Sequence, residues 1–394
     1  MSAGTETAQA TAEAVRTAAA PILDGLRAGA ARRDAEREHP FAEIRALADA
    51  GVLRLRVPVA DGGAGGSVRE LAELVVDIAA ADSNVAQALR PGFLVAERLV
   101  TGDLDAAERA DLAEKVRRGD LFAGTVNERG GVPGGVRTTL TRDEHGLRID
   151  GTKYYSTGGL HAQWFSGSAV DDDGRIVGFT VPTDREGVRL VDDFDAVGQR
   201  LTASGSTVLD GVRVDESEVS AAAAVRTHPH GSLAHLILAA ALSGIAQAAS
   251  DDAVRIVREV ARPIKHSGAA RATEDPYVRE VVGKIATAAF TARAQVVAAA
   301  EALDRHWERA TSTSAVEAVV AVGEAYIGAG VQALAAAELV FDVGGGTLTG
   351  RGLGLDRHWR NARTVANHNP RAWKAAAIGA WLLDGEAPPA NGLF

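Results

Sequence analysis

The fold of this chain is decided in its middle, where residues 146–158 read GLRIDGTKYYSTG. Apolar and polar side chains alternate along this stretch, and such alternation predicts a strand with one buried face. The same alternation occurs in three further segments separated by Gly/Asp turns: Val136–Thr141, Arg175–Pro182 and Thr207–Val214. The sequence therefore predicts a β-domain over residues 119–220.

Helical patterns flank this β-domain on both sides. In the N-terminal flank, Ser67 is followed three positions later by Glu70, which predicts a capping box at the start of a helix. In the C-terminal flank, apolar residues recur at helical spacing in four segments: Leu233–Arg262, Pro276–Thr311, Ala315–Phe341 and Pro370–Leu383. Alanine-rich helices of this length suit a closely packed four-helix bundle. We therefore predict an α+β chain with domains over residues 1–118, 119–220 and 221–394.

Composition and charge exclude several classes of function. The net charge is −10, which disfavours a nucleic-acid or anionic-membrane surface. The chain has no cysteine, and no group of histidines has carboxylates at metal-ligand spacing. Residues 1–20 lack the basic start and apolar run of a secretory signal, and the apolar stretch Leu233–Ala249 is interrupted by Ser, Gly and Gln. We expect a cytoplasmic protein with no metal, no nucleic acid and no membrane among its partners.

Three segments resemble motifs of the acyl-CoA dehydrogenase superfamily and follow one another in the same order. They are residues 47–58, which precede a glycine loop, residues 151–158 and residues 198–207. The resemblance spans nearly the whole chain. It implies an acyl-CoA dehydrogenase-like fold with an N-terminal helical domain, a middle β-barrel or β-sandwich and a C-terminal four-helix bundle. It also implies a homotetramer, because the family builds each flavin site from more than one subunit.

The C-terminal block narrows this resemblance. Leu355–Thr364 (LDRHWRNART), followed by His368 and Pro370, is similar to the flavin-dependent monooxygenase branch, which includes dibenzothiophene and sulfone monooxygenases and amino-sugar N-oxygenases. Residues 360–370 contain no carboxylate, where a dehydrogenase carries its glutamate base. The resemblance implies FMN, supplied as FMNH2 by a separate flavin reductase, with FAD as the alternative cofactor. Reaction with O2 through a flavin C4a-(hydro)peroxide would oxygenate a small sulfur, aromatic or amine substrate.

The resemblance implies a catalytic role for His368. A histidine titrates near neutrality, so it can hydrogen-bond a peroxide or take a proton from the substrate. The alternative is that His368 only caps the last helix. The chain departs from the branch at two places. Asn369, the candidate partner of His368, stands where the branch often has aspartate, and Gln87, Arg90 and Gly92 occupy the helix where a second imidazole is expected.

The resemblance also implies the flavin contacts. Ser156 and Thr157, on the predicted strand, are expected at the N5 side of the flavin, where the Ser156 hydroxyl is also a candidate catalytic group. Asn127 can both donate and accept hydrogen bonds at the pyrimidine end. Arg262 resembles the branch's phosphate-binding arginine. The loop Gly344-Gly345-Gly346 is expected to offer backbone N–H groups to the flavin of a neighbouring subunit, although a glycine loop also ends helices.

Two other functions remain open at the level of the sequence. The first is an FAD-dependent acyl-CoA dehydrogenase whose base lies on the bundle, where Glu259, Glu274 and Glu280 are the candidates. The second is a non-catalytic scaffold that keeps the fold and binds no flavin. The three readings differ in the flavin that they bind and in the oxidation state in which they bind it.

Overall fold

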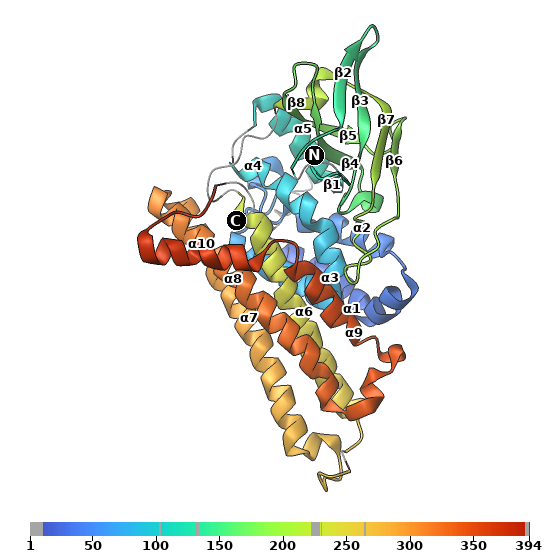
Figure 1. Cartoon of the computed structure of the whole chain (residues 1–394), viewed down its shortest axis with the longest axis vertical. Helices are drawn as coiled ribbons and strands as arrows, with labels where there is room; N and C mark the ends of the chain where they lie inside the picture. Colours follow the sequence, from blue (N-terminus) through green and yellow to red (C-terminus); the bar gives the residue numbers. More distant parts are fainter. Residues whose placement is uncertain are drawn as a thin grey trace, which may run out of the picture.

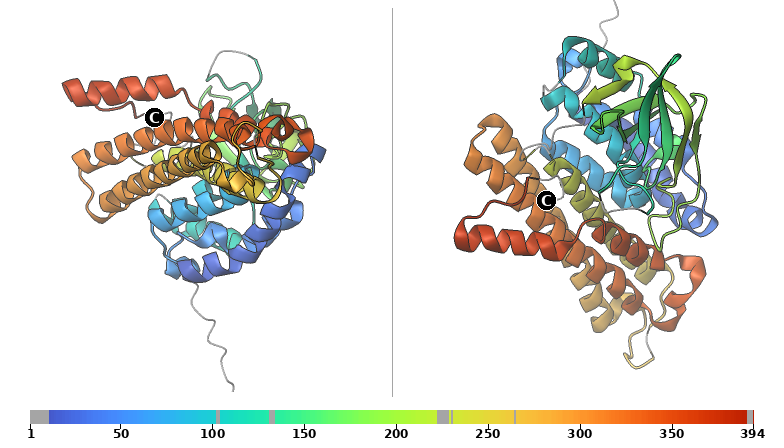
Figure 2. Two further views of the ribbon diagram at one scale, coloured as in Figure 1. Left: turned by 90° about the horizontal axis from the view of Figure 1, so that it is seen from below. Right: turned by 45° about the horizontal axis from the view of Figure 1, so that its top comes forward.

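The chain divides into three structural regions. The computed structural model describes residues 11–101, 104–130, 134–221, 229, 231–263, 265–390 and 394. Figure 1 shows the β-strands at one end of the molecule and the long C-terminal helices at the other, with N-terminal helices between them. The right-hand view of Figure 2 shows the same division. The predicted α+β order, with N-terminal helices, a middle β-domain and C-terminal helices, is confirmed.

The N-terminal region is helical. Its helices are α1 (Ala12–Glu36), α2 (Phe41–Asp49), α3 (Val68–Ala96), α4 (Arg98–Thr101) and α5 (Ala106–Arg117). The predicted capping box is present at the start of α3, where the Ser67 hydroxyl accepts a hydrogen bond from the Glu70 N–H and the Glu70 carboxylate accepts one from the Ser67 N–H. The helix is kinked at Asp82, whose φ of −158° and ψ of 110° are not helical. The part of α3 beyond this kink reaches the centre of the molecule.

The strands form one mixed sheet, in the order β6-β7-β3-β2-β4-β5-β8, with β1 paired to β4. They are β1 (Phe122–Gly124), β2 (Thr139–Asp143), β3 (Gly146–Lys153), β4 (Trp164–Val170), β5 (Ile176–Pro182), β6 (Val188–Leu190), β7 (Thr207–Val214) and β8 (Val219–Ala221). Ile149, Phe165, Val181 and Val212 are completely buried in its core, because alternate side chains of a strand face one side. The strand predicted through Tyr155 ends earlier, since Tyr155 adopts a left-handed conformation with φ of 64°.

The C-terminal region contains α6 (Ser232–Glu259), α7 (Pro276–Glu308), α8 (Ser312–Leu339), α9 (Asp356–Ala366) and α10 (Arg371–Asp384). The helix α9 was not predicted; it packs against α6 and α8, whereas α10 crosses the bundle (Figure 1). By length and composition α6 and α8 could cross a membrane, contrary to the sequence expectation. However, 83% of the most apolar window of α6 is buried inside the protein, as is usual for a core helix of a soluble protein.

A buried polar network joins the three regions. The Asn84 side-chain oxygen, on α3, accepts a hydrogen bond from the Leu201 N–H at 3.1 Å. The Gln199 N–H donates to Asn361 Oδ1 of α9 at 2.6 Å, and the Gln199 amide donates to Ser83 Oγ at 2.8 Å. Gln199 is 3% exposed and has a φ of 57°, so these bonds hold a sterically disfavoured backbone. The network fixes α3, the β-domain and α9 relative to one another.

Candidate active site

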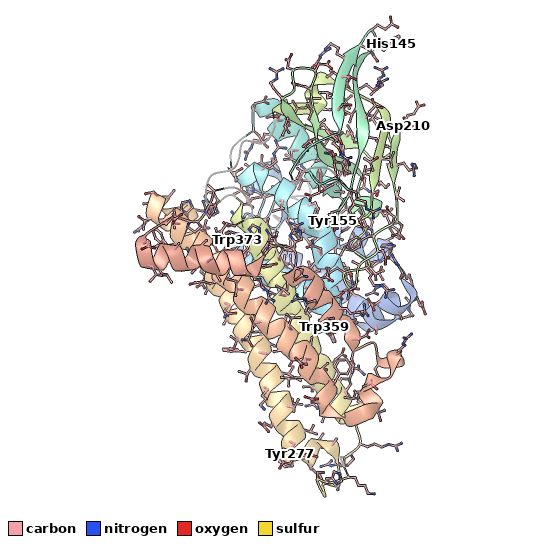
Figure 3. All side chains as sticks on the ribbon, in the orientation of Figure 1. His145, Tyr155, Asp210, Tyr277, Trp359 and Trp373 are labelled. Carbon is pink, nitrogen blue, oxygen red and sulfur yellow. The ribbon has the colours of Figure 1, made fainter. Side chains whose placement is uncertain are left out.

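A cavity of about 1080 Å³ opens where the three regions meet. Its walls come from all of them: Gln87 and Arg90 of α3, residues 124–128 with Tyr155 and Thr157 of the β-domain, and Trp359, residues 363–365 and His368 of α9 and the turn after it. Figure 3 shows Tyr155 and Trp359 between the β-domain and the bundle. A site of this size, formed at a domain junction, suits a large organic cofactor together with a substrate.

His368 follows the end of α9 and opens onto this cavity. Its Nδ1 lies 2.7 Å from Asn369 Oδ1, and its Nε2 lies 3.2 Å from Nη2 of Arg90. An amide oxygen only accepts and a guanidinium only donates, so Nδ1 carries the proton and Nε2 is an acceptor. Burial and the neighbouring Arg90 lower the pKa of His368 to about 4, against the hydrogen bond to Asn369. At neutral pH, His368 is therefore an uncharged base.

Tyr326 holds the turn that carries His368. Its side chain is completely buried in α8, and its hydroxyl donates to the Val365 carbonyl at 3.0 Å and accepts from the Asn369 N–H at 3.2 Å. Asn369 is 5% exposed. The Asn369 side chain therefore orients the imidazole and selects its tautomer, as a carboxylate would. It does so without the negative charge that would raise the pKa of the imidazole.

The opposite wall belongs to the β-domain. Asn127 is exposed in the cavity, and its carbonyl accepts the Tyr154 N–H at 3.0 Å. Thr157 is 6% exposed; its hydroxyl accepts from Ser204 at 3.1 Å and has only a 3.5 Å contact to the Tyr155 carbonyl for its own proton. The Thr157 hydroxyl can therefore turn to donate to a bound ligand.

A buried ion pair ties residues 124–128 to strand β3. Nζ of Lys153 lies 2.8 Å from Oε1 of Glu128, and the two side chains are 0% and 3% exposed. The Glu128 carboxylate also accepts from the N–H and the hydroxyl of Thr138. These donors lower the pKa of Glu128 to about 2 although burial raises it. Because Glu128 is fully engaged as an acceptor, it positions Asn127 and is not free to act as a base.

The structure places Ser156 differently from Thr157. Ser156 lies beyond the end of β3 rather than on it, because the left-handed Tyr155 turns the chain. Its side chain is 1% exposed, and its hydroxyl accepts from Thr207 at 2.7 Å. Ser156 does not line the cavity. Because this hydroxyl accepts from Thr207, its own proton stays available, and its roles in catalysis and flavin binding remain predictions.

Arg262 and the glycine loop lie together at the other end of the bundle. A side chain on Gly344 would meet Ala261, next to Arg262. His235, near the start of α6, is close enough to the cavity residue His368 for the two imidazoles to interact electrostatically. From His235, helix α6 runs ~36 Å to its end at Glu259. Within one subunit, Arg262 and Gly344-Gly345-Gly346 are thus far from the cavity that contains the other predicted flavin contacts.

The alternative dehydrogenase bases are not at the site. Glu259 ends α6, Glu274 pairs with Arg271, and Glu280 pairs with Lys284 on α7. None of the three lines the cavity. Within one subunit, these three glutamates therefore lie outside the cavity.

Several cavity residues were missed by the sequence prediction. Trp359 and Arg363 are spaced by four residues, and His368 follows them; this spacing aligns side chains on one face of α9. Predicting α9 would have identified them. Tyr155 was read as a strand residue, but its ring is 53% exposed and lines the cavity.

Comparison with known proteins agrees with this architecture. Residues 5–101 match the family Acyl-CoA dehydrogenase, N-terminal domain, and residues 236–371 match Acyl-CoA dehydrogenase, C-terminal domain. The chain is 32% identical over 388 residues to a dibenzothiophene monooxygenase of Rhodococcus erythropolis, covering 93% of this chain and 92% of that protein. It is 30% identical over 372 residues to the probable FMNH2-dependent monooxygenase SfnC of Pseudomonas putida, covering 91% and 92%.

Solved structures give the same result. FMN-bound TdsC from Paenibacillus sp. A11-2 is 28% identical, with a TM-score of 0.87, covering 96% of this chain and 100% of that one. Methanesulfinate monooxygenase MsuC from Pseudomonas fluorescens is 28% identical, with a TM-score of 0.84, covering 98% and 100%. The chain therefore has the acyl-CoA dehydrogenase fold. Within that superfamily, it belongs to the flavin-dependent monooxygenases.

Proposed function

We propose that this chain is the oxygenase of a two-component system and uses FMN, delivered as FMNH2 by diffusion from a separate flavin reductase. FMNH2 supplies two electrons and two hydrogens to O2: one oxygen atom enters the substrate, the other leaves as water, and FMN remains. The substrate is a small organic molecule. We place the reaction in the cytoplasm, as a pool of reduced flavin requires a reducing compartment.

The observation that carries this proposal is the combination of residues in one cavity. Asn127 and Thr157 offer hydrogen bonds to a flavin ring, and Tyr155 offers a half-exposed aromatic face. His368 faces the same space as a neutral base, with an amide partner where a dehydrogenase has a glutamate. An uncharged imidazole can hold or take a proton next to the oxygen atom being transferred. FMN in the related TdsC structure supports FMN over FAD.

Anaerobic titration with FMN, FMNH2 and FAD tests the proposal. We expect FMNH2 to bind more tightly than oxidised FMN, because an enzyme supplied by diffusion must release the oxidised product. Addition of O2 to the bound FMNH2 should then give substrate oxygenation, or hydrogen peroxide when substrate is absent. Protein that is isolated with tightly bound FAD and that oxidises an acyl-CoA would establish the dehydrogenase instead. Protein that binds none of the three flavins would establish the non-catalytic scaffold.

We further propose a homotetramer in which Arg262 and Gly344-Gly345-Gly346 of one subunit complete the flavin site of another. Their separation from the cavity within one subunit supports this arrangement. Arg262→Ala should weaken FMNH2 binding by about 10- to 100-fold, the usual worth of a charge-assisted hydrogen bond. Light scattering should give the same tetrameric mass for the variant, and the nearby exposed Arg258→Ala serves as control. Unchanged FMNH2 affinity in tetrameric Arg262→Ala would contradict the arrangement.

A further inference from the structure

Arg90, which lines the cavity, is a cation without a carboxylate partner among the described residues. It lies on α3 beyond the kink, and its only hydrogen bond among the described residues is the one to His368 at 3.2 Å. No carboxylate in this part of the chain lies within ion-pair distance of Arg90. By contrast Arg33, whose side chain is 3% exposed, has a carboxylate partner: its Nη2 lies 3.0 Å from a carboxylate oxygen of Asp82.

Three segments outside the described residues adjoin described parts of the cavity or the start of α6 in the sequence, and their composition is informative. Residues 131–133, between two cavity-lining glycines, and residues 222–228 and 230, which precede α6, contain no Asp or Glu. The same is true of residues 391–393. Among the described residues, Arg90 therefore carries a charge that no carboxylate compensates.

The two carboxylates that line the cavity are not available to Arg90. Glu128 is bound by Lys153, and Asp195 is exposed on the β-domain side. Burial lowers the pKa of Arg90 to about 10, so the guanidinium remains protonated at neutral pH. A partly buried cation of this kind is stabilised when an anion approaches it.

Gln87 lies one helical turn before Arg90 on the same face of α3. Its side chain is 7% exposed, lines the cavity, and has an Oε1 with no hydrogen-bond partner among the described residues. A buried amide without a partner costs free energy unless a ligand satisfies it, and rotation of the amide presents either its N–H2 or its oxygen. Arg90 and Gln87 thus offer a charged and a neutral group to one ligand.

The surrounding residues keep this wall electropositive. His235 of α6 is 3% exposed, and its Nδ1 has no partner in the described part of the chain. Burial, followed by the neighbouring Lys374, His368 and Arg90, lowers the pKa of His235 to about 3, against a hydrogen bond to the Phe394 backbone. His235 and His368 are therefore neutral beside the positive charges of Arg90 and Lys374. An anionic ligand would offset these positive charges.

We infer that the substrate is a small organic acid whose anionic oxygens bind to the Arg90 guanidinium and the Gln87 amide. This inference rests on the proposed function. The planar guanidinium fork matches the two oxygens of a carboxylate or a sulfinate. Bound there, the acid places its adjoining atoms beside Nε2 of His368 and across the cavity from Asn127 and Thr157.

Calorimetric titration of the FMN complex tests this inference separately from turnover. The ligands are matched pairs of acid and neutral analogue: benzoate and benzamide, benzenesulfinate and methyl phenyl sulfone, and methanesulfinate and dimethyl sulfone. We expect at least one acid to bind at least about 10-fold more tightly than its analogue. The preferred pair then shows whether carboxylates or sulfinates are selected.

Variants locate the contact. Arg90→Gln should weaken binding of the preferred acid by about 10- to 100-fold and leave its neutral analogue and FMNH2 unchanged. Arg90→Lys should recover part of the loss, since it keeps the charge and loses the fork. Gln87→Leu should show a smaller loss, of about 3- to 10-fold. Arg363→Gln, which removes an exposed charge from the same cavity, should change acid binding by less than about 3-fold.

The outcomes separate the inference from the proposed function. Neutral analogues that bind as tightly as their acids would overturn the inference, and so would acid binding that survives in Arg90→Gln. Weakened FMNH2 binding in Arg90→Gln, with acid binding retained, would show that Arg90 faces the flavin instead. In each of these cases, FMNH2 binding and oxygenation by the wild-type protein would still stand. Failure of the wild type to bind FMNH2 would instead reject the proposed function.

Discussion

Replacing His368 with alanine is expected to uncouple the reaction: the variant should bind FMNH2 as the wild type does but release hydrogen peroxide in place of oxygenated product. The imidazole is the only described basic group that lines the cavity as a neutral acceptor. A positioned acid or base contributes roughly 10²- to 10⁴-fold to a rate. We expect product formation to fall by at least about 100-fold. Product and peroxide are to be quantified together with FMNH2 consumption.

Two further variants make this result specific. His145→Ala removes an exposed histidine on the turn after β2 (Figure 3) and should leave the yield unchanged. Asn369→Ala should give an intermediate loss of product, because the imidazole keeps its place but loses the partner that selects its tautomer. Full product yield from His368→Ala, at normal FMNH2 affinity, would reject the role of His368.

The largest effect on stability is expected from Lys153→Met. This change removes the buried ammonium partner of Glu128, whose side chain is 3% exposed, and leaves it only the exposed Arg137 guanidinium, at 3.4 Å, as an ion-pair partner among the described residues. Breaking one side of a buried ion pair costs about 3–5 kcal/mol in the free energy of unfolding. Urea denaturation followed by circular dichroism measures it. The double variant Glu128→Gln/Lys153→Met should recover much of the loss, since no charge then remains buried.

A control and a pH series complete this test. Arg175→Met removes a guanidinium from an ion pair whose arginine side chain is 71% exposed, and should change stability by less than about 1 kcal/mol. The pKa of Glu128 is lowered from 4.5 to about 2 in the folded protein. The contribution of the Glu128 carboxylate to the free energy of unfolding is therefore complete above the pKa that Glu128 has in the unfolded chain. It is lost as the pH falls from 4.5 toward 2. A Lys153→Met variant as stable as the wild type at neutral pH would contradict this account.

The spacing of apolar residues predicted strands and helices well where one periodicity runs through the whole element. The strand Thr207–Val214 has the bounds that alternation predicted, and the capping box of Ser67 and Glu70 starts α3. The prediction was less good where a single residue breaks the period. The left-handed Tyr155 ends β3 early and turns Ser156 toward Thr207, while Thr157 lines the cavity. Periodicity alone does not reveal such a turn, because the conformation depends on contacts from elsewhere.

The sequence by itself determined the architecture and the class of chemistry. Periodicity predicted most of the elements, and residues 360–370 contain no glutamate base. Only the tertiary structure decided how the site is charged. Arg90 and His368 are 278 positions apart and meet because α3 and α9 pack into one junction. Arginines are common along the chain, but a partly buried arginine without a carboxylate among the described residues is recognised only in the tertiary structure, because its energetic cost depends on what surrounds it.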